Sequence, residues 1–153
     1  MNEHPHYTKT WTIGSEYGQE KKVIAGIAAA FAELGIPSAR LEDIATAVSE
    51  ACLNGLEHGN RLDARRQVSV RMNVFTAKTV FRISDEGPGF DYRHWESSRT
   101  ARLPKEKLQA ENPRGWGLYL IGRLADAVRF GNEAGIFFTE LEFANRLPER
   151  EDR

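Results

Sequence analysis

The stretch SEACLNGLEHGN, Ser49–Asn60, lies in a segment whose apolar residues follow the period of a long helix. Its adjacent asparagine and glycine, Asn54 and Gly55, together cost a helix roughly 1.5 kcal/mol relative to two alanines. Against a total stability of about 5–15 kcal/mol, that is a noticeable loss. The position of these two residues therefore indicates that they supply something other than helix stability.

The helix that contains this stretch is predicted to begin near Pro37 and to end at Gly59. Proline suits the first helical turn, where its missing N–H is not needed, and glycine suits the position after the last turn. At about 100° per residue the apolar side chains fall on one narrow stripe, which we expect to face the core. This stripe consists of Leu41, Ile44, Ala45, Val48, Cys52 and Leu56.

Three polar residues, Glu50, Asn54 and His58, recur at four-residue spacing and are predicted to stack on one side of this helix. Measured from Leu41, Glu50 and Asn54 lie at about 180° and 220°, pointing away from the core. A carboxamide oxygen can bind Mg²⁺, and a carboxylate beside it can act as a general base. The simpler alternative is a solvated helix face. The neighbours expected on this face are small, namely Ala47, Ala51 and Gly55.

The remaining elements predict an α+β fold. A strand at 7–13 and a helix at 17–34 precede the long helix; the hairpin 67–85, a helix after 114 and the hairpin 127–145 follow it. Because strands come in adjacent pairs, we expect a mixed, mainly antiparallel sheet with helices on one face, a two-layer α/β sandwich. Residues 93–113 are polar without periodicity and are predicted to form a long loop.

Composition bounds the class of protein. The chain has 153 residues and a net charge of −1, which fits one domain over 1–153, with its core at about 7–145, and no general affinity for nucleic acid. Its single cysteine, Cys52, fits a reducing compartment. No segment has the pattern of a leader or a membrane span, so we expect a cytoplasmic protein with no membrane partner.

A second motif, DEGPGF at 85–90, places a carboxylate and two glycines directly after a strand. Asp85 can accept a hydrogen bond from an amino group such as that of adenine, and Gly87 and Gly89 permit close approach. The alternative is a tight turn with a capping aspartate.

A third motif, RGWGL at 114–118, opens a helix. Free N–H groups at a helix start can face a phosphate, and Arg114 can add a charged contact. The alternative here is an ordinary capped loop.

Together, the order ExxxNxxxH on a helix, DxGxG after a strand and GxG opening a later helix resembles the GHKL ATPase superfamily. Within it, the forms SEACLNGLEHGN, SDEGPGFD and RGWGLYLIGRLADAV resemble the anti-sigma-factor serine kinases. The resemblance covers roughly residues 7–145. It implies the GHKL type of sandwich with an ATP lid, formed here by 93–113.

The resemblance also implies a role for each matching residue. Glu50 is the implied catalytic base, or orients the attacking hydroxyl, and Asn54 is the implied ligand of Mg²⁺ and the phosphates. Asp85 is implied to bind the adenine amino group. The other implied ATP-binding residues are Gly87 and Gly89 beside the base, and Arg114, Gly115, Gly117 and Leu118 at the phosphates.

The implied function is an ATP-dependent protein-serine kinase that acts as an anti-sigma factor. It phosphorylates a STAS-type anti-anti-sigma partner, sequesters a sigma factor and forms a homodimer. Two alternatives stay open: a nucleotide-dependent binding module without turnover, and a switch kinase that does not bind sigma. The catalytic domain of a histidine kinase is disfavoured, because we find no helical hairpin with a phosphoacceptor histidine in the sequence.

Overall fold

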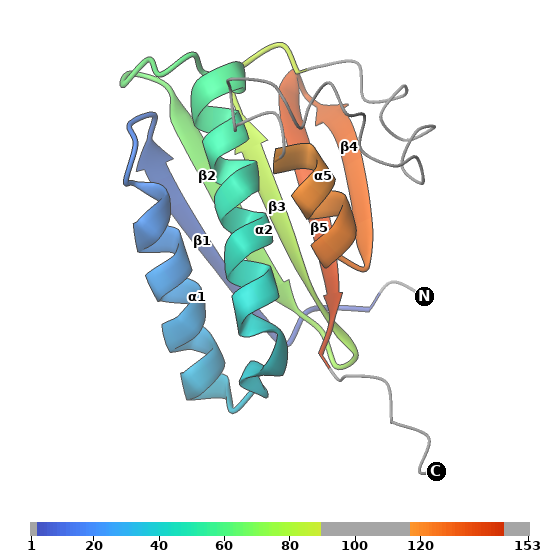
Figure 1. Cartoon of the computed structure of the whole chain (residues 1–153). Coiled ribbons are helices and arrows are strands. Elements are labelled where there is room, and N and C mark those ends of the chain that lie inside the picture. Colours follow the sequence, from blue (N-terminus) through green and yellow to red (C-terminus); the bar gives the residue numbers. More distant parts are fainter. Residues whose placement is uncertain (1–2, 90–116, 146–153) are drawn as a thin grey trace.

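The computed structural model describes residues 3–89 and 117–145, which form a five-stranded sheet with helices on one face (Figure 1). A 3₁₀ turn, Ser38–Arg40, precedes α2, and a π-helical turn, Gly55–Gly59, continues it. The sheet with helices on one face (Figure 1) confirms the predicted α+β two-layer sandwich. The other elements are β1 (Tyr7–Gly14), α1 (Glu20–Leu34), α2 (Leu41–Asn54), β2 (Gln67–Val74), β3 (Lys78–Asp85), α5 (Gly117–Leu124), β4 (Ala127–Glu133) and β5 (Ile136–Ala144).

The strand order is β1-β2-β3-β5-β4, and each neighbouring pair is antiparallel. Mainly antiparallel pairing was expected, but the parallel component of a mixed sheet does not occur among the described strands. The reason is the second hairpin: β5 turns back at Ala134–Gly135, where both residues have positive φ, and inserts between β3 and β4. Strands β3 and β4 therefore run in the same direction without touching as neighbours.

Strands β2 and β3 place alternate side chains in the core, as their sequence pattern predicted. Every second residue of β2 is buried, and the same holds for β3. The buried apolar residues of these strands are Val68, Val70, Met72, Val74, Phe81 and Ile83.

Helix α1 ends at Leu34, as the sequence predicted, and is followed by Gly35, which has a φ of +67°. The N–H of Ile36 donates to the carbonyl of Phe31 at 3.0 Å, which closes the helix end in the way that a left-handed glycine allows. This turn sends the chain into α2, so both helices lie on the same face of the sheet (Figure 1).

Helix α2 lies between α1 and α5 and is the central helix of the layer (Figure 1). Its neighbours on both sides explain one departure from the prediction. The small residues Ala47, Ala51 and Gly55 were expected on an outer face, but all three are buried. Glu50 and Asn54 are accordingly half-buried rather than fully solvated.

Helix α5 ends at Leu124, and Val128 already lies in β4, within the predicted hairpin. The N–H of Asp126 donates to the carbonyl of Glu142 at 2.8 Å, so the chain has joined the sheet by that residue. From the start of α2, the Arg40 guanidinium bonds the Leu124 carbonyl at 2.9 Å and the Asp126 carboxylate at 2.5 Å. The carboxyl end of α5 is thereby tied to α2.

Candidate functional site

The π-helical turn after α2 gives the candidate site its floor. The N–H of Asn60 donates to the Gly55 carbonyl at 2.8 Å, five residues back, which widens the last turn. Such π turns frequently occur at functional sites. Gly55 has an ordinary helical φ of −63°, so it is not needed for backbone freedom. A Cβ there would lie 3.3 Å from the Val68 side chain, so a larger residue would make a tight contact.

Asp85, the last residue of β3, lies over this turn and is 7% exposed. Its Oδ1 accepts a hydrogen bond from the Gly87 N–H at 2.8 Å. Its Oδ2 has no hydrogen-bond partner among residues 3–89 and 117–145. Burial raises the pKa of this carboxyl, and the Gly87 N–H opposes that rise only in part. A buried acceptor without a partner fits a ligand that donates a hydrogen bond.

Two glycines after Asp85 bring the loop close to its surroundings. A Cβ on Gly87 would fall 2.1 Å from the carbonyl oxygen of Gly59, so these two backbones are in direct contact. Gly89 has a φ of +77° and lies against the ring of Phe137, 2.5 Å from where a Cβ would be. Phe137 is a neighbour of the motif that sequence reasoning did not identify, because its contact depends on the pairing of β3 with β5.

Glu50 and Asn54 face the first residue of α5. A Cβ on Gly117 would fall 2.9 Å from Glu50 Oε2 and 3.3 Å from both polar atoms of the Asn54 amide. The Asn54 side chain makes no hydrogen bond to any other residue that the structure describes. The structure thus brings together a carboxylate, an uncommitted carboxamide and a helix N-terminus, whose N–H groups favour an anion.

The other predicted residues are placed as follows. Leu118 is half-buried and packs against the core beside Gly117. Arg114, Gly115 and the expected lid, 93–113, lie outside the described residues. His58 has an exposed side chain 3.9 Å from the Glu57 carboxylate, and the structure gives it no part in the site.

Asn60 is the residue that sequence reasoning missed. It is 1% exposed and joins the π turn to the loop after Asp85. Its position directly after the predicted helix end, in the run His58-Gly59-Asn60, reads as part of an ordinary turn. Only the pairing of three distant segments makes it a buried contact.

Comparison with known proteins assigns the class. The family described as "Histidine kinase-like ATPase domain" matches residues 13–137, so the chain belongs to that family. Its relatives include "Serine-protein kinase RsbW" of Bacillus subtilis (strain 168), 30% identical over 122 residues, which are 80% of this chain and 74% of that protein. The protein of the same name from Bacillus licheniformis is 33% identical over 123 residues, 80% of this chain and 75% of the relative.

Two solved structures share the fold. The structure of the RsbU and RsbW domains of Rv1364c from Mycobacterium tuberculosis matches 91% of this chain and 32% of its own chain, with a TM-score of 0.63 and 20% identity. The SiaB–SiaC complex from Pseudomonas aeruginosa contains a chain that matches 89% of this one and 88% of itself, with a TM-score of 0.59 and 16% identity. The resemblance to serine kinases of the GHKL type is confirmed, and with it the use of a nucleotide.

Proposed function

We propose that this protein transfers the γ-phosphate of Mg-ATP to a serine of a STAS-type anti-anti-sigma partner and also binds a sigma factor. The observation that carries the proposal lies at the carboxyl end of α2, where Glu50 and Asn54 meet Gly117. Over the π turn that follows, Asp85 presents an Oδ2 that has no hydrogen-bond partner among the described residues. The first set of groups is of the kind that the metal and phosphates of ATP require, and the second is of the kind that its base requires. The relatives named as serine-protein kinases support the choice of serine.

Asp85 would recognise the base. Its Oδ2 accepts a hydrogen bond from the adenine amino group, which satisfies the buried oxygen. Gly87 and Gly89 let the loop after Asp85 lie directly against Gly59 and Phe137. The π turn holds the carboxylate in place through the contact between Gly59 and Asp85.

Asn54 would hold the metal. Among residues 3–89 and 117–145, no group of three or more His, Cys, Asp or Glu side chains could hold an ion. The Asn54 carboxamide fits Mg²⁺, which commonly binds one or two protein oxygens together with substrate phosphates. When bound, Mg²⁺ neutralises charge on the phosphates. Gly117, with Arg114 and Gly115 before it, would contact those phosphates at the start of α5.

Glu50 would orient or deprotonate the attacking serine hydroxyl. Its Oε2 lies at the start of α5, beside the amide of Asn54. Phosphoryl transfer needs mainly positioning and charge stabilisation, so one oriented carboxylate is sufficient for the protein's part in proton transfer.

The proposal includes a homodimer and a location in the cytoplasm. None of the helices that the structure describes has the length and apolar character of a membrane span. The deciding experiment mixes the purified protein with Mg-ATP and candidate STAS proteins and locates phosphoserine by mass spectrometry. A single modified serine in one partner supports the kinase. Binding of ATP and of a partner without phosphate transfer would instead identify a binding module.

A further inference from the structure

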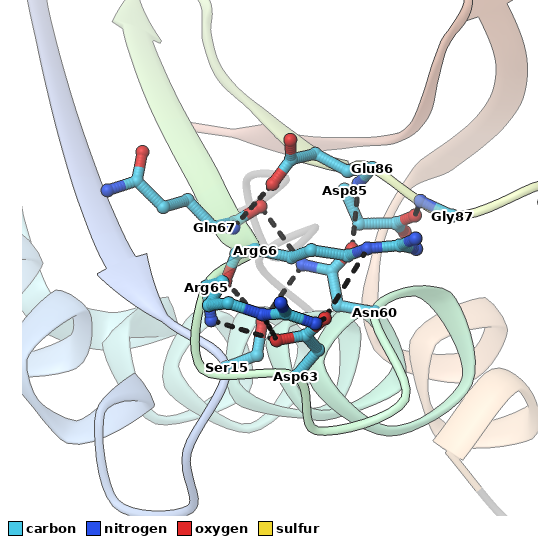
Figure 2. Close-up of polar contacts among 9 residues, drawn as sticks. All are labelled: Ser15, Asn60, Asp63, Arg65, Arg66, Gln67, Asp85, Glu86 and Gly87. Carbon is cyan, nitrogen blue, oxygen red and sulfur yellow. Dashed lines mark hydrogen bonds and ion pairs between the residues drawn. The ribbon is translucent and has the colours of Figure 1, made fainter.

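The carboxamide of Asn60 joins three segments that are far apart in the sequence (Figure 2). Its Oδ1 accepts from the Glu86 N–H at 2.8 Å. Its Nδ2 donates to Ser15 Oγ and to the Gln67 carbonyl, each at 3.0 Å. Both N–H bonds of the amide and one oxygen lone pair are therefore used, and the side chain is 1% exposed.

These bonds affect Asp85 because Asn60 and Glu86 each directly follow a residue that takes part in the Asp85–Gly59 contact. Asn60 follows Gly59, and Glu86 follows Asp85. Gly59 and Gly87 are in backbone contact, and the Asp85 carboxylate rests on Gly59. The bond from Glu86 to Asn60 thus fixes the loop one residue away from the carboxylate. Among residues 3–89 and 117–145, Asn60 is the one side chain that accepts a hydrogen bond from the Glu86 N–H, while the Glu86 carboxylate accepts a second bond from the Gln67 N–H at 2.7 Å.

We propose that Asn60 is a positioning residue that fixes Asp85 and thereby makes the site select adenine over guanine; the inference rests on the proposed function. An amino group donates to the Asp85 carboxylate, whereas guanine presents a carbonyl oxygen at the corresponding ring position, and two acceptors repel. Discrimination requires the carboxylate to stay in place. A loop released from Asn60 allows Asp85 to turn away from a guanine carbonyl.

The test measures the dissociation constants of ATP and GTP by calorimetry for the wild type, Asn60→Ala and Ser15→Ala. Ser15→Ala is the matched control, because it removes one bond to Nδ2 and the bond from Ser15 Oγ to the Arg66 carbonyl but leaves the Glu86 contact. We expect Asn60→Ala to weaken ATP binding about tenfold and GTP binding much less, so the ATP preference falls. Ser15→Ala lowers the melting temperature and keeps that preference.

The ratio of the dissociation constants of ATP and GTP separates loss of positioning from a general loss of structure. Partial unfolding weakens the binding of both nucleotides equally and leaves the ratio unchanged. If Asn60→Ala does not fold, Asn60→Ser replaces it, since its hydroxyl ends one bond short of the Oδ1 position and leaves a smaller void. An unchanged ratio in a folded Asn60 variant overturns the inference. If the ratio is unchanged in the Asn60 variant but Asp85→Asn loses the ATP preference of the wild type, the proposed function stands while the role of Asn60 fails. A wild type that binds neither nucleotide overturns both.

Discussion

The carboxylate of Asp85 rests directly on the backbone of Gly59, so that a Cβ on Gly59 would fall 2.4 Å from Asp85 Cγ. This contact joins the last residue of β3 to the π turn that follows α2. It leaves no room for a side chain at position 59. The same turn begins at Gly55, whose own Cβ would be 3.7 Å from Asp85 Oδ2.

We expect Gly59→Ala to weaken ATP binding by at least tenfold, because the added methyl group displaces the buried carboxylate that would receive the adenine amino group. Calorimetry measures the affinity, and thermal unfolding measures the accompanying loss of stability. Gly14→Ala is the control, since the nearest atom to its Cβ is at an ordinary 3.9 Å. Equal ATP affinities in the two variants would contradict the Asp85–Gly59 contact as the floor of the site.

Asp85 also predicts a dependence of stability on pH. Burial raises the pKa of Asp85 in the folded state above its ordinary value of 3.8. The folded protein therefore holds the proton more tightly than the unfolded chain, and the free energy of unfolding falls as the pH rises from 3.8 through the raised value. In Asp85→Asn this contribution is absent. We expect the variant to gain stability relative to the wild type as the pH increases, and to bind ATP more weakly.

Urea unfolding at several pH values, without nucleotide, measures this difference. Asp63→Asn serves as the opposite case, because hydrogen bonds from Arg65 lower the pKa of Asp63. Parallel pH profiles for the wild type and Asp85→Asn would show that burial does not govern this carboxyl.

Glu50→Ala should retain ATP affinity and lose phosphotransfer by about 10²–10⁴-fold, the usual contribution of a general base. The half-buried carboxylate lies at the start of α5, next to Asn54 and Gly117. A rate assay with labelled ATP and the STAS partner measures the transfer. Glu42→Ala on the exposed side of α2 is the control and should keep the wild-type rate. Transfer at the wild-type rate by Glu50→Ala would remove Glu50 from the mechanism.

Arg40→Lys should lower the free energy of unfolding by about 1–2 kcal/mol although it keeps the charge. The planar guanidinium bonds two partners at once, the Leu124 carbonyl and the Asp126 carboxylate, which a single ammonium does not reproduce. Denaturant unfolding measures the change. Arg65→Lys, whose side chain is 89% exposed, should change stability by less than about 0.5 kcal/mol. Equal values for both variants would show that Arg40 does not secure α5.

Most of the fold follows from local patterns in the sequence. The alternation in β2 and β3 and the stop at Gly35 each depend on a few adjacent residues, so both were predictable. The insertion of β5 between β3 and β4 depends on a contact between distant segments, and no local pattern encodes it. The same reason hides Asn60, whose partners Ser15, Gln67 and Glu86 come from three places in the chain.

Residue types and their spacing predicted the candidate site. They did not predict which sides of α2 are covered by the neighbouring helices (Figure 1). The 100° rule placed Ala47 and Ala51 outside, because it describes one helix and contains no neighbour. In the folded protein, α5 packs beside α2, and its first residue, Gly117, contacts Glu50 and Asn54. The π turn was hidden for a related reason, since a change from four-residue to five-residue bonding is set by what the turn packs on.

Asn54 and Gly59 belong to one continuous run of helical backbone, from α2 into its terminal π turn. This one helical segment therefore sets the spacing between the metal end of the proposed site, at Asn54, and its base end, at Gly59. A nucleotide in the proposed site must therefore place its purine and its metal-bound phosphates at the separation that this helical segment sets.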